Sequence, residues 1–155
     1  MAELAPGIQA PDFTLPRDGG GSVSLADFRG RPVVLFFYPK DDTEGCTTEA
    51  RDFTAAKADF DAAGIALLGL SPDPVKKHDR FIQKHDLGVA LASDEGLSTL
   101  EAYGVWKEKS MYGRTYMGVE RTTVLVDADG RIAEIWRKVK VKGHVEAVLD
   151  AARKL

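Results

Sequence analysis

Cysteine is almost missing from this sequence, since Cys46 is the only one among 155 residues. A single thiol cannot close an internal disulfide, and it supplies neither a Cys-x-x-Cys redox pair nor the ligands of a structural zinc site. Any redox chemistry therefore requires Cys46 alone or a thiol from another molecule.

An excess of positive charge is also missing. The formal net charge is −3 at pH 7, which gives no long-range attraction for nucleic acid or an anionic membrane. The opening MAELAPGIQAPDFTLP lacks the basic start and apolar run of a secretory signal, and no later segment approaches the length of a membrane span. We therefore expect a cytoplasmic protein without a nucleic-acid or membrane partner.

Internal repeats and low-complexity segments are absent too. Hydrophobic residues make up 44% and charged residues 29% of the chain, which is ordinary globular composition. Because 155 residues is the size of one compact domain, we expect residues 1–155 to form a single domain.

Apolar runs alternate with helical periodicities along the chain. Expected strands lie at residues 32–39, 65–71, 89–93, 121–127 and 131–137, and expected helices at residues 44–63, 73–87, 94–105 and 142–155. The glycine-rich RDGGGS, residues 17–22, separates two short alternating segments and predicts an N-terminal β-hairpin. This order predicts an α/β protein with a central mixed β-sheet flanked by helices, and it fits a thioredoxin-like fold.

Cys46 lies in the first turn of the expected helix that follows a buried strand. A free cysteine is most often a small buried hydrophobe without chemistry. Reactive cysteines, however, occupy electropositive and partly exposed places such as helix N-termini, because only the thiolate attacks. Gly45 leaves the backbone N–H groups beside Cys46 accessible to a small ligand.

A helix terminus alone is a weak stabiliser of a thiolate. The helix dipole contributes about 0.3–1 kcal/mol, whereas a cation at about 4 Å contributes up to about 4 kcal/mol at an effective dielectric constant near 20. A reactive Cys46 therefore requires a nearby cation. The candidates are Lys40, Arg51, Arg114 and Arg121, and their spacing does not choose among them. Arg121 opens an apolar strand, where it is equally consistent with an ordinary charge at a strand end.

Three segments together resemble a known family. APDFTLP near the start, FFYPKDDTEGCTTEA at 36–50 and YGVWKEKSMYGRTYMGVERTTVLVDADG at 103–130 resemble a peroxiredoxin of the bacterioferritin-comigratory-protein or PrxQ type. The most specific part is the pattern Pro-x-x-x-Thr-x-x-Cys, which Pro39, Thr43 and Cys46 match, and Arg121 matches the distant arginine of the family. The resemblance extends over nearly the whole chain.

The resemblance implies a thiol-dependent peroxidase that reduces hydrogen peroxide and organic hydroperoxides without a cofactor or metal. Cys46 would become a sulfenic acid. Arg121, the Thr43 hydroxyl and the backbone N–H groups of Gly45 and Cys46 would stabilise the charge on the leaving oxygen, and Pro39 would shield the thiolate from water. Thr43 is also consistent with a helix N-cap, and Pro39 with a strand terminator.

The sequence departs from its relatives at the positions of the second cysteine. Arg51 stands five residues after Cys46, where many relatives carry a resolving cysteine, and the next expected helix contains none. Reduction must then come from an external thiol such as thioredoxin, glutaredoxin or a small thiol, and the resemblance implies a monomer or weak dimer. Glu44 replaces a proline of the family; it would disfavour the thiolate if it pointed inward and would favour the helix dipole if it faced solvent.

Two functions other than a peroxidase are also consistent with a lone cysteine. A cysteine hydrolase would need a histidine base beside Cys46, but His78, His85 and His144 are each expected at the surface of a helix. A non-enzymatic thioredoxin-fold module that binds partner proteins would carry Cys46 as an inert residue.

Two further features are expected to have no catalytic role. Glu49 lies one helical turn after Cys46 and could orient an arginine, but a solvated helix charge is expected. The segment SMYGRTYMG, residues 110–118, contains two methionines and two tyrosines and is expected to be a mobile loop.

Overall fold

A five-stranded mixed sheet forms the centre of the computed structural model, which describes residues 4–155. Its strand order is β5-β4-β3-β8-β9. The strands are β3 (Val33–Phe37), β4 (Ala66–Ser71), β5 (Ala90–Ser93), β8 (Thr122–Val126) and β9 (Ile132–Trp136). β3, β4 and β5 run parallel, whereas β8 is antiparallel to β3 and to β9, so the expected mixed sheet is confirmed.

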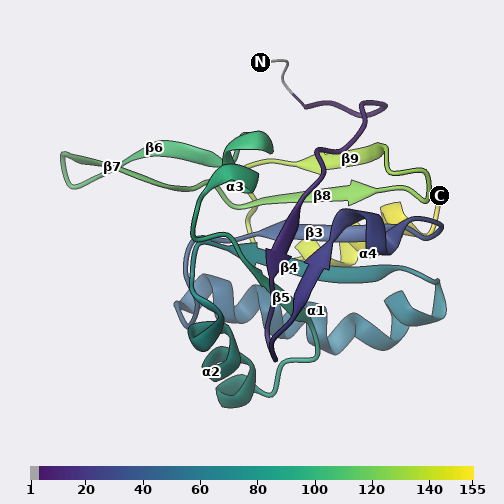
Figure 1. Cartoon of the computed structure of the whole chain (residues 1–155), viewed down its shortest axis with the longest axis horizontal. Coiled ribbons are helices and arrows are strands. Elements are labelled where there is room, and N and C mark those ends of the chain that lie inside the picture. Colours follow the sequence, from purple (N-terminus) through teal and green to yellow (C-terminus); the bar gives the residue numbers. More distant parts are fainter. Residues whose placement is uncertain (1–3) are drawn as a thin grey trace.

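The central position of β3 explains its unbroken apolar sequence. All five of its residues are buried, because successive side chains point to opposite faces and both faces are covered. One face packs against β1 (Thr14–Pro16), β2 (Ser22–Ser24), a 3-10 turn at Leu25–Phe28 and α3 (Ser98–Ala102). The other face packs against α1 (Glu44–Ala62), α4 (His144–Ala152) and, through Phe81, α2 (Val75–His85) (Figure 1). The expected N-terminal hairpin is β1 paired antiparallel with β2.

α1 is the helix that positions Cys46. It buries Ala50, Phe53 and Phe60 on one face, as the periodicity predicts, and it ends just before Gly64, which has φ +76°. Its other face is polar, and none of the helices in residues 4–155 combines the length and apolar character needed to cross a membrane.

α3 is shorter than expected. The helix was predicted from Asp94, but the segment before Ser98 forms a turn instead, with Leu97 at the N-cap in a left-handed conformation. Asp94 still serves the helix, because its buried carboxylate accepts the backbone N–H of Leu100 at 2.8 Å. Asp94 therefore supports the start of α3 from outside the helix, four residues before Ser98.

Residues 106–119 form a second hairpin, not the mobile loop expected for residues 110–118. β6 (Trp106–Met111) pairs antiparallel with β7 (Arg114–Val119), and the hairpin projects beyond the central sheet (Figure 1). Tyr112 and Gly113 join the strands with φ of 52° and 76°, the two positive values that a type I′ turn requires. The expectation was wrong because most side chains of the hairpin are exposed, so no apolar alternation marks its strands.

Candidate active site

Cys46 lies in the first turn of α1, directly beyond the carboxyl end of β3. Its side chain is buried, with only 2% of the residue exposed. The backbone N–H groups of a first helical turn have no partner inside the helix, so those of Gly45 and Cys46 are available to a ligand. The expected position of the thiol at a helix N-terminus is confirmed.

Arg121 reaches Cys46 from the start of β8. One terminal nitrogen, Nη2, donates to Cys46 Sγ at 3.3 Å, and the other, Nη1, donates to Glu49 Oε1 at 2.8 Å. A Cβ atom on residue 45 would lie 3.1 Å from Arg121 Nη2, which is closer than most such contacts. Gly45 therefore allows the guanidinium to lie against the helix start, a steric requirement that the sequence did not reveal.

Glu49 is part of this site, contrary to the expectation of a solvated charge. It is fully buried, and its position three residues after Cys46 places both side chains on the same face of α1. Burial raises the pKa of Glu49 to about 7, although the charge and hydrogen bonds of Arg121 act to lower it. Burial acts to lower the pKa of Arg121, but the charges and hydrogen bonds of Glu49 and Cys46 outweigh this effect and raise it.

The second oxygen of Glu49 is left without a partner. Oε2 is buried and accepts no hydrogen bond from the described part of the chain, residues 4–155. The triad of Cys46, Arg121 and Glu49 therefore includes one buried oxygen that can still accept a hydrogen bond.

Thr43 and Pro39 border the site on the segment that joins β3 to α1. Thr43 occupies the N-cap position, but its hydroxyl does not cap the helix and instead donates to the carbonyl of Lys40 at 2.8 Å. Pro39 is half-buried directly after β3, and Glu44 is exposed at the helix start. Glu44 therefore takes the solvent-facing orientation that favours the helix dipole.

The other expected cations form no hydrogen bond with the sulfur, but a lysine that the sequence did not indicate binds the backbone two residues before Arg121. Lys40, Arg51 and Arg114 are exposed. Lys109 of β6 is partly buried, and its Nζ donates to the carbonyl of Val119 at 2.7 Å. Burial and the charge of Arg121 lower the pKa of Lys109, whereas the charge of Cys46 raises it. An assignment of residues 106–111 as a strand that begins near Arg121 would have pointed to it, because Trp106 pairs with Val119.

The histidines were predicted at the surface, and for two of them this is wrong. His78 is fully buried, with Nδ1 2.6 Å from Asp41 Oδ2 and Nε2 3.0 Å from the carbonyl of Ala92. His144 is buried against Thr123, at 2.7 Å, and burial lowers its pKa to about 4. His85 is half-buried and pairs with Asp42. None of these pairings involves Cys46, so a cysteine hydrolase lacks its base among residues 4–155.

The segment carrying Pro39 and Thr43 is held by the Asp41 cluster, defined as Tyr38, Asp41, Asp73 and His78. The hydroxyl of Tyr38 donates to Asp41 Oδ1 at 2.6 Å, and the N–H of Asp41 donates to Asp73 Oδ2 at 2.8 Å. Burial acts to lower the pKa of His78, but the hydrogen bond and charge of Asp41 outweigh it and raise the pKa. The cluster fixes the path of the chain between β3 and α1.

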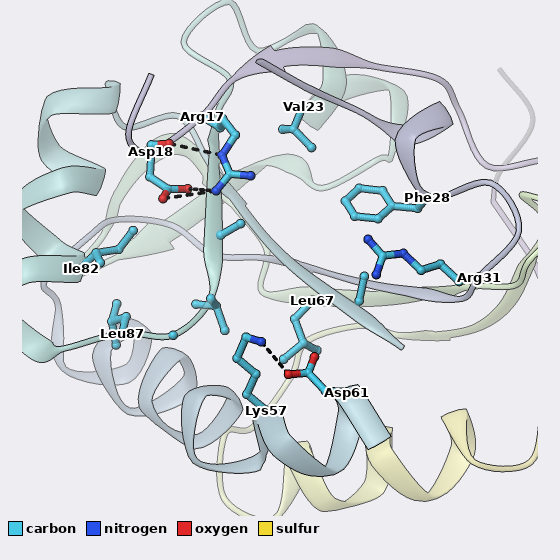
Figure 2. A pocket seen from close by; sticks show the side chains of 14 residues that line it. Arg17, Asp18, Val23, Phe28, Arg31, Lys57, Asp61, Leu67, Ile82 and Leu87 are labelled. Carbon is cyan, nitrogen blue, oxygen red and sulfur yellow. Dashed lines mark hydrogen bonds and ion pairs between the residues drawn. The ribbon is translucent and has the colours of Figure 1, made fainter. Parts of the chain in front are cut away.

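A cleft of about 430 Å³ lies at the opposite end of the parallel strands. It is lined by residues at the starts of β4 and β5, including Leu67 and Ala90, whereas Cys46 follows the end of β3. Figure 2 shows four of its charged side chains in two ion pairs, Arg17 with Asp18 and Lys57 with Asp61. This cleft is separate from the candidate active site.

Comparisons with known proteins show the family to which the chain is related. Residues 6–135 match the model of the AhpC/TSA family. Peroxiredoxin Bcp of Bacillus subtilis is 46% identical over 147 residues, covering 95% of this chain and 94% of that protein. A structure concerned with alkyl peroxide reduction by the bacterioferritin comigratory protein of Xanthomonas campestris has a TM-score of 0.90 at 42% identity, covering 97% of this chain and 98% of that chain. A PrxQ mutant from Xylella fastidiosa has a TM-score of 0.93 at 35% identity, covering 99% and 98%. The fold is thus that of the thioredoxin-fold peroxiredoxins.

Proposed function

Because this chain belongs to the AhpC/TSA family, as a thiol-dependent peroxidase of the peroxiredoxin type, we propose that Cys46 is its peroxidatic nucleophile and Arg121 the main group that activates it. The observation that carries this proposal is the guanidinium bridge from Cys46 to Glu49, at 3.3 Å and 2.8 Å. A planar guanidinium held at one end by a carboxylate presents its other end to the sulfur in a fixed orientation.

In the proposed reaction the Cys46 thiolate attacks one oxygen of the peroxide in line with the O–O bond. The S–O bond forms as the O–O bond breaks, and the sulfur becomes a sulfenic acid. The other oxygen leaves with negative charge and takes a proton from water, which yields water or an alcohol. Arg121 and the N–H groups of Gly45 and Cys46 stabilise that developing charge.

Thr43 and Pro39 complete the proposed site. The Thr43 hydroxyl donates a hydrogen bond to the Lys40 carbonyl, so its oxygen is available to accept a hydrogen bond from the O–H of the peroxide. This role as an acceptor replaces the donor role expected from the resemblance. Pro39, half-buried after β3, limits the access of water to the thiolate.

We propose that hydrogen peroxide and organic hydroperoxides are the substrates and that an external thiol completes the cycle. The alkyl peroxide reduction studied in the Xanthomonas campestris relative supports the organic class. Cys46 is the only cysteine in the chain, so thioredoxin, glutaredoxin or a small thiol must attack the sulfenic sulfur and release water. A second reductant thiol then releases Cys46 as thiol.

The remaining expectations extend this proposal. Residues 1–155 act as one catalytic domain, supported by the packing of the N-terminal segment on β9, where the Gly7 N–H donates to the Ile132 carbonyl at 2.8 Å. The protein acts as a monomer or weak dimer in the cytoplasm, where a lone thiol is kept reduced. Sedimentation and cell fractionation test these two points.

A titration of free thiol against hydrogen peroxide tests the central proposal. One equivalent of peroxide should consume the thiol of Cys46 and add one oxygen, which an external thiol reverses, and a large excess should add a second oxygen that it does not reverse. Cys46→Ser should abolish peroxide consumption and keep the fold. Substantial activity in Cys46→Ser would show that another group is the nucleophile. A Cys46 thiol that does not react with peroxide would favour the alternative of a partner-binding module with an inert cysteine.

A further inference from the structure

The pairing of β6 with β7 sorts the side chains of this hairpin onto two different faces. Residues directly opposite in an antiparallel pair share a face, and neighbours along a strand alternate. One face, here named the cationic face, carries Lys107, Lys109, Met111, Arg114 and Tyr116. The other carries Trp106, Glu108, Ser110, Thr115, Met117 and Val119. Three cations and two large side chains that contact little else thus share one side of the hairpin.

The cationic face reaches the segment that carries Arg121. Lys109 Nζ donates to the carbonyl of Val119 at 2.7 Å, two residues before Arg121, so its ammonium group lies at the base of the hairpin. A Cβ on Gly118 would lie 3.1 Å from Lys109 Cδ, so the stem of this lysine crosses the hairpin at its base. From there the face extends outward to Arg114, on the part of the hairpin that projects from the molecule (Figure 1).

Tyr112 at the tip of the hairpin is strained and fully exposed. It has φ 52° in the type I′ turn, a left-handed conformation that is unfavourable for most residues with a side chain and for which Asn or Gly is the usual choice. The residue is 98% exposed. A residue that breaks the local turn preference without a contact inside the chain indicates a function outside the chain.

The charge of the hairpin is opposite to that of the whole chain. Residues 106–119 contain three cations and one carboxylate, in a chain of net charge −3. Lys107 pairs with Glu120 at 3.3 Å, but Arg114 forms no ion pair with any residue in 4–155. Four of the six exposed large hydrophobic residues in the described chain belong to this hairpin: Met111, Tyr112, Tyr116 and Met117. Such a mixture of aromatic, methionine and arginine side chains is typical of a protein interface.

We propose that the cationic face and Tyr112 form the docking surface for an acidic protein dithiol that reduces the Cys46 sulfenic acid. The inference rests on the proposed function and names the class of its reductant. The reductant's first thiolate attacks Cys46 Sγ, water leaves, and its second thiol breaks the mixed disulfide, so the reductant supplies both electrons. Charge complementarity favours an acidic partner, whereas two copies of this hairpin placed face to face would bring like charges together.

The test separates the two halves of the catalytic cycle in three variants of the full chain. Arg114→Gln removes one positive charge from the cationic face, and Ser110→Glu adds one negative charge to the opposite face as a matched control. Tyr112→Asn removes the ring while supplying a residue that the turn prefers. For each variant, oxidation by hydrogen peroxide is measured first. Reduction of the preformed sulfenic acid is then measured with dithiothreitol and with an acidic thioredoxin.

Arg114→Gln should lower the second-order rate constant with thioredoxin by about threefold or more at low salt, and the loss should shrink at high salt. Tyr112→Asn should lower that rate constant by a similar factor without lowering the melting temperature. Rates with dithiothreitol and with hydrogen peroxide should stay at wild-type values in all three variants, and Ser110→Glu should keep its rate with thioredoxin.

Two results would overturn the docking surface. Undiminished rates with thioredoxin in Arg114→Gln and Tyr112→Asn would show that the face is not used, and equal losses with dithiothreitol would show that the variants disturb Cys46 itself. A dimer seen by sedimentation that both variants abolish would make a second copy the occupant. Failure of the wild-type protein to consume hydrogen peroxide is a separate outcome, which would contradict the proposed function.

Discussion

Two buried acid–base pairs lie near the start of α1, one through Asp41 before the helix and one through Glu49 within it, and they differ in which polar atoms have no hydrogen-bond partner. Asp41 and His78 meet at 2.6 Å, and Glu49 and Arg121 at 2.8 Å. In the first pair both carboxylate oxygens and both ring nitrogens have partners. In the second, one carboxylate oxygen has none and one guanidinium nitrogen contacts a sulfur.

The difference indicates which pair is structural and which is reactive. A fully satisfied buried network fixes one conformation, because any change leaves a buried polar group without a partner. A network with an unpaired atom beside a nucleophile can bind a reacting group without first breaking its own hydrogen bonds. The contrast supports the proposal that the pair of Glu49 and Arg121 serves the chemistry, whereas the Asp41 cluster holds the segment between β3 and α1.

Removal of the histidine should therefore damage the fold more than the reaction. His78→Asn leaves a buried carboxylate without its cation and should lower the free energy of unfolding by about 3–5 kcal/mol. The raised pKa of His78 means that its contribution is complete below pH 6.5 and is lost as the pH rises through the value in the folded protein. Urea unfolding at several pH values measures both effects, and the gap between wild type and variant should narrow at high pH.

A milder change keeps this prediction testable if His78→Asn does not fold. Tyr38→Phe removes only the hydroxyl bonded to Asp41 and should cost about 1–2 kcal/mol. The peroxide rate constant of each folded variant should equal that of the wild type. A large loss of rate at full folding would place the Asp41 cluster in the chemistry and remove the distinction between the two pairs.

Arg121→Lys should have the opposite signature, a slow reaction in a folded protein. A lysine keeps the charge but cannot bridge the sulfur and Glu49 as a planar fork, and loss of one preorganised donor typically costs about 10²–10³-fold in rate. Stopped-flow measurement of Cys46 oxidation gives the rate constant. Arg114→Lys on the projecting hairpin is the matched control and should react with hydrogen peroxide at the wild-type rate. If Arg121→Lys also reacts at the wild-type rate, another cation activates Cys46.

The contrast between the pairs also explains what the sequence could predict. The central strands, α1 and the position of Cys46 follow from apolar periodicity and from a glycine after the helix, which are local signals. Whether Glu49 or His78 is buried depends on Arg121 and Asp41, which lie 72 and 37 residues away, and nothing near either residue announces its partner. The hairpin of β6 and β7 was missed for a different reason, because a strand exposed on both faces has no apolar alternation.

Glu49→Gln should change the pH dependence of stability. Burial raises the pKa of Glu49 from its ordinary value of 4.5 to about 7, so the fold favours the protonated form. Its contribution is complete below pH 4.5 and is lost as the pH rises through about 7. Glutamine cannot ionise, so between pH 4.5 and pH 8 the wild type should lose up to about 3 kcal/mol relative to Glu49→Gln.

The measurement for Glu49 is the difference in unfolding free energy between variant and wild type at the two pH values. Glu44→Gln, at an exposed position of the same helix, is the control and should show little pH dependence. A difference for Glu49→Gln that does not vary with pH would mean that Glu49 keeps one protonation state over this range. In that case Glu49 would not titrate between pH 4.5 and pH 8, although one of its oxygens has no hydrogen-bond partner.

Thr43→Val should have the smallest effect on the oxidation rate. It tests whether Thr43, on the segment held by the Asp41 cluster, contacts the peroxide as well. Valine keeps the shape of threonine but cannot accept the O–H of a peroxide, so the oxidation rate should fall by about tenfold, the value of one hydrogen bond near 1.4 kcal/mol. Thr43→Ser keeps the hydroxyl and should stay within about twofold of wild type. Thr48→Val is the matched control, because the hydroxyl of Thr48 also donates to a backbone carbonyl, that of Glu44 at 3.0 Å, but Thr48 follows Cys46 by two residues within α1. The rate constants of all four proteins are compared after correction for the folded fraction. If Thr43→Val and Thr48→Val slow the reaction equally, the hydroxyl of Thr43 only supports the start of α1; a loss confined to Thr43→Val would make its oxygen a contact of the peroxide.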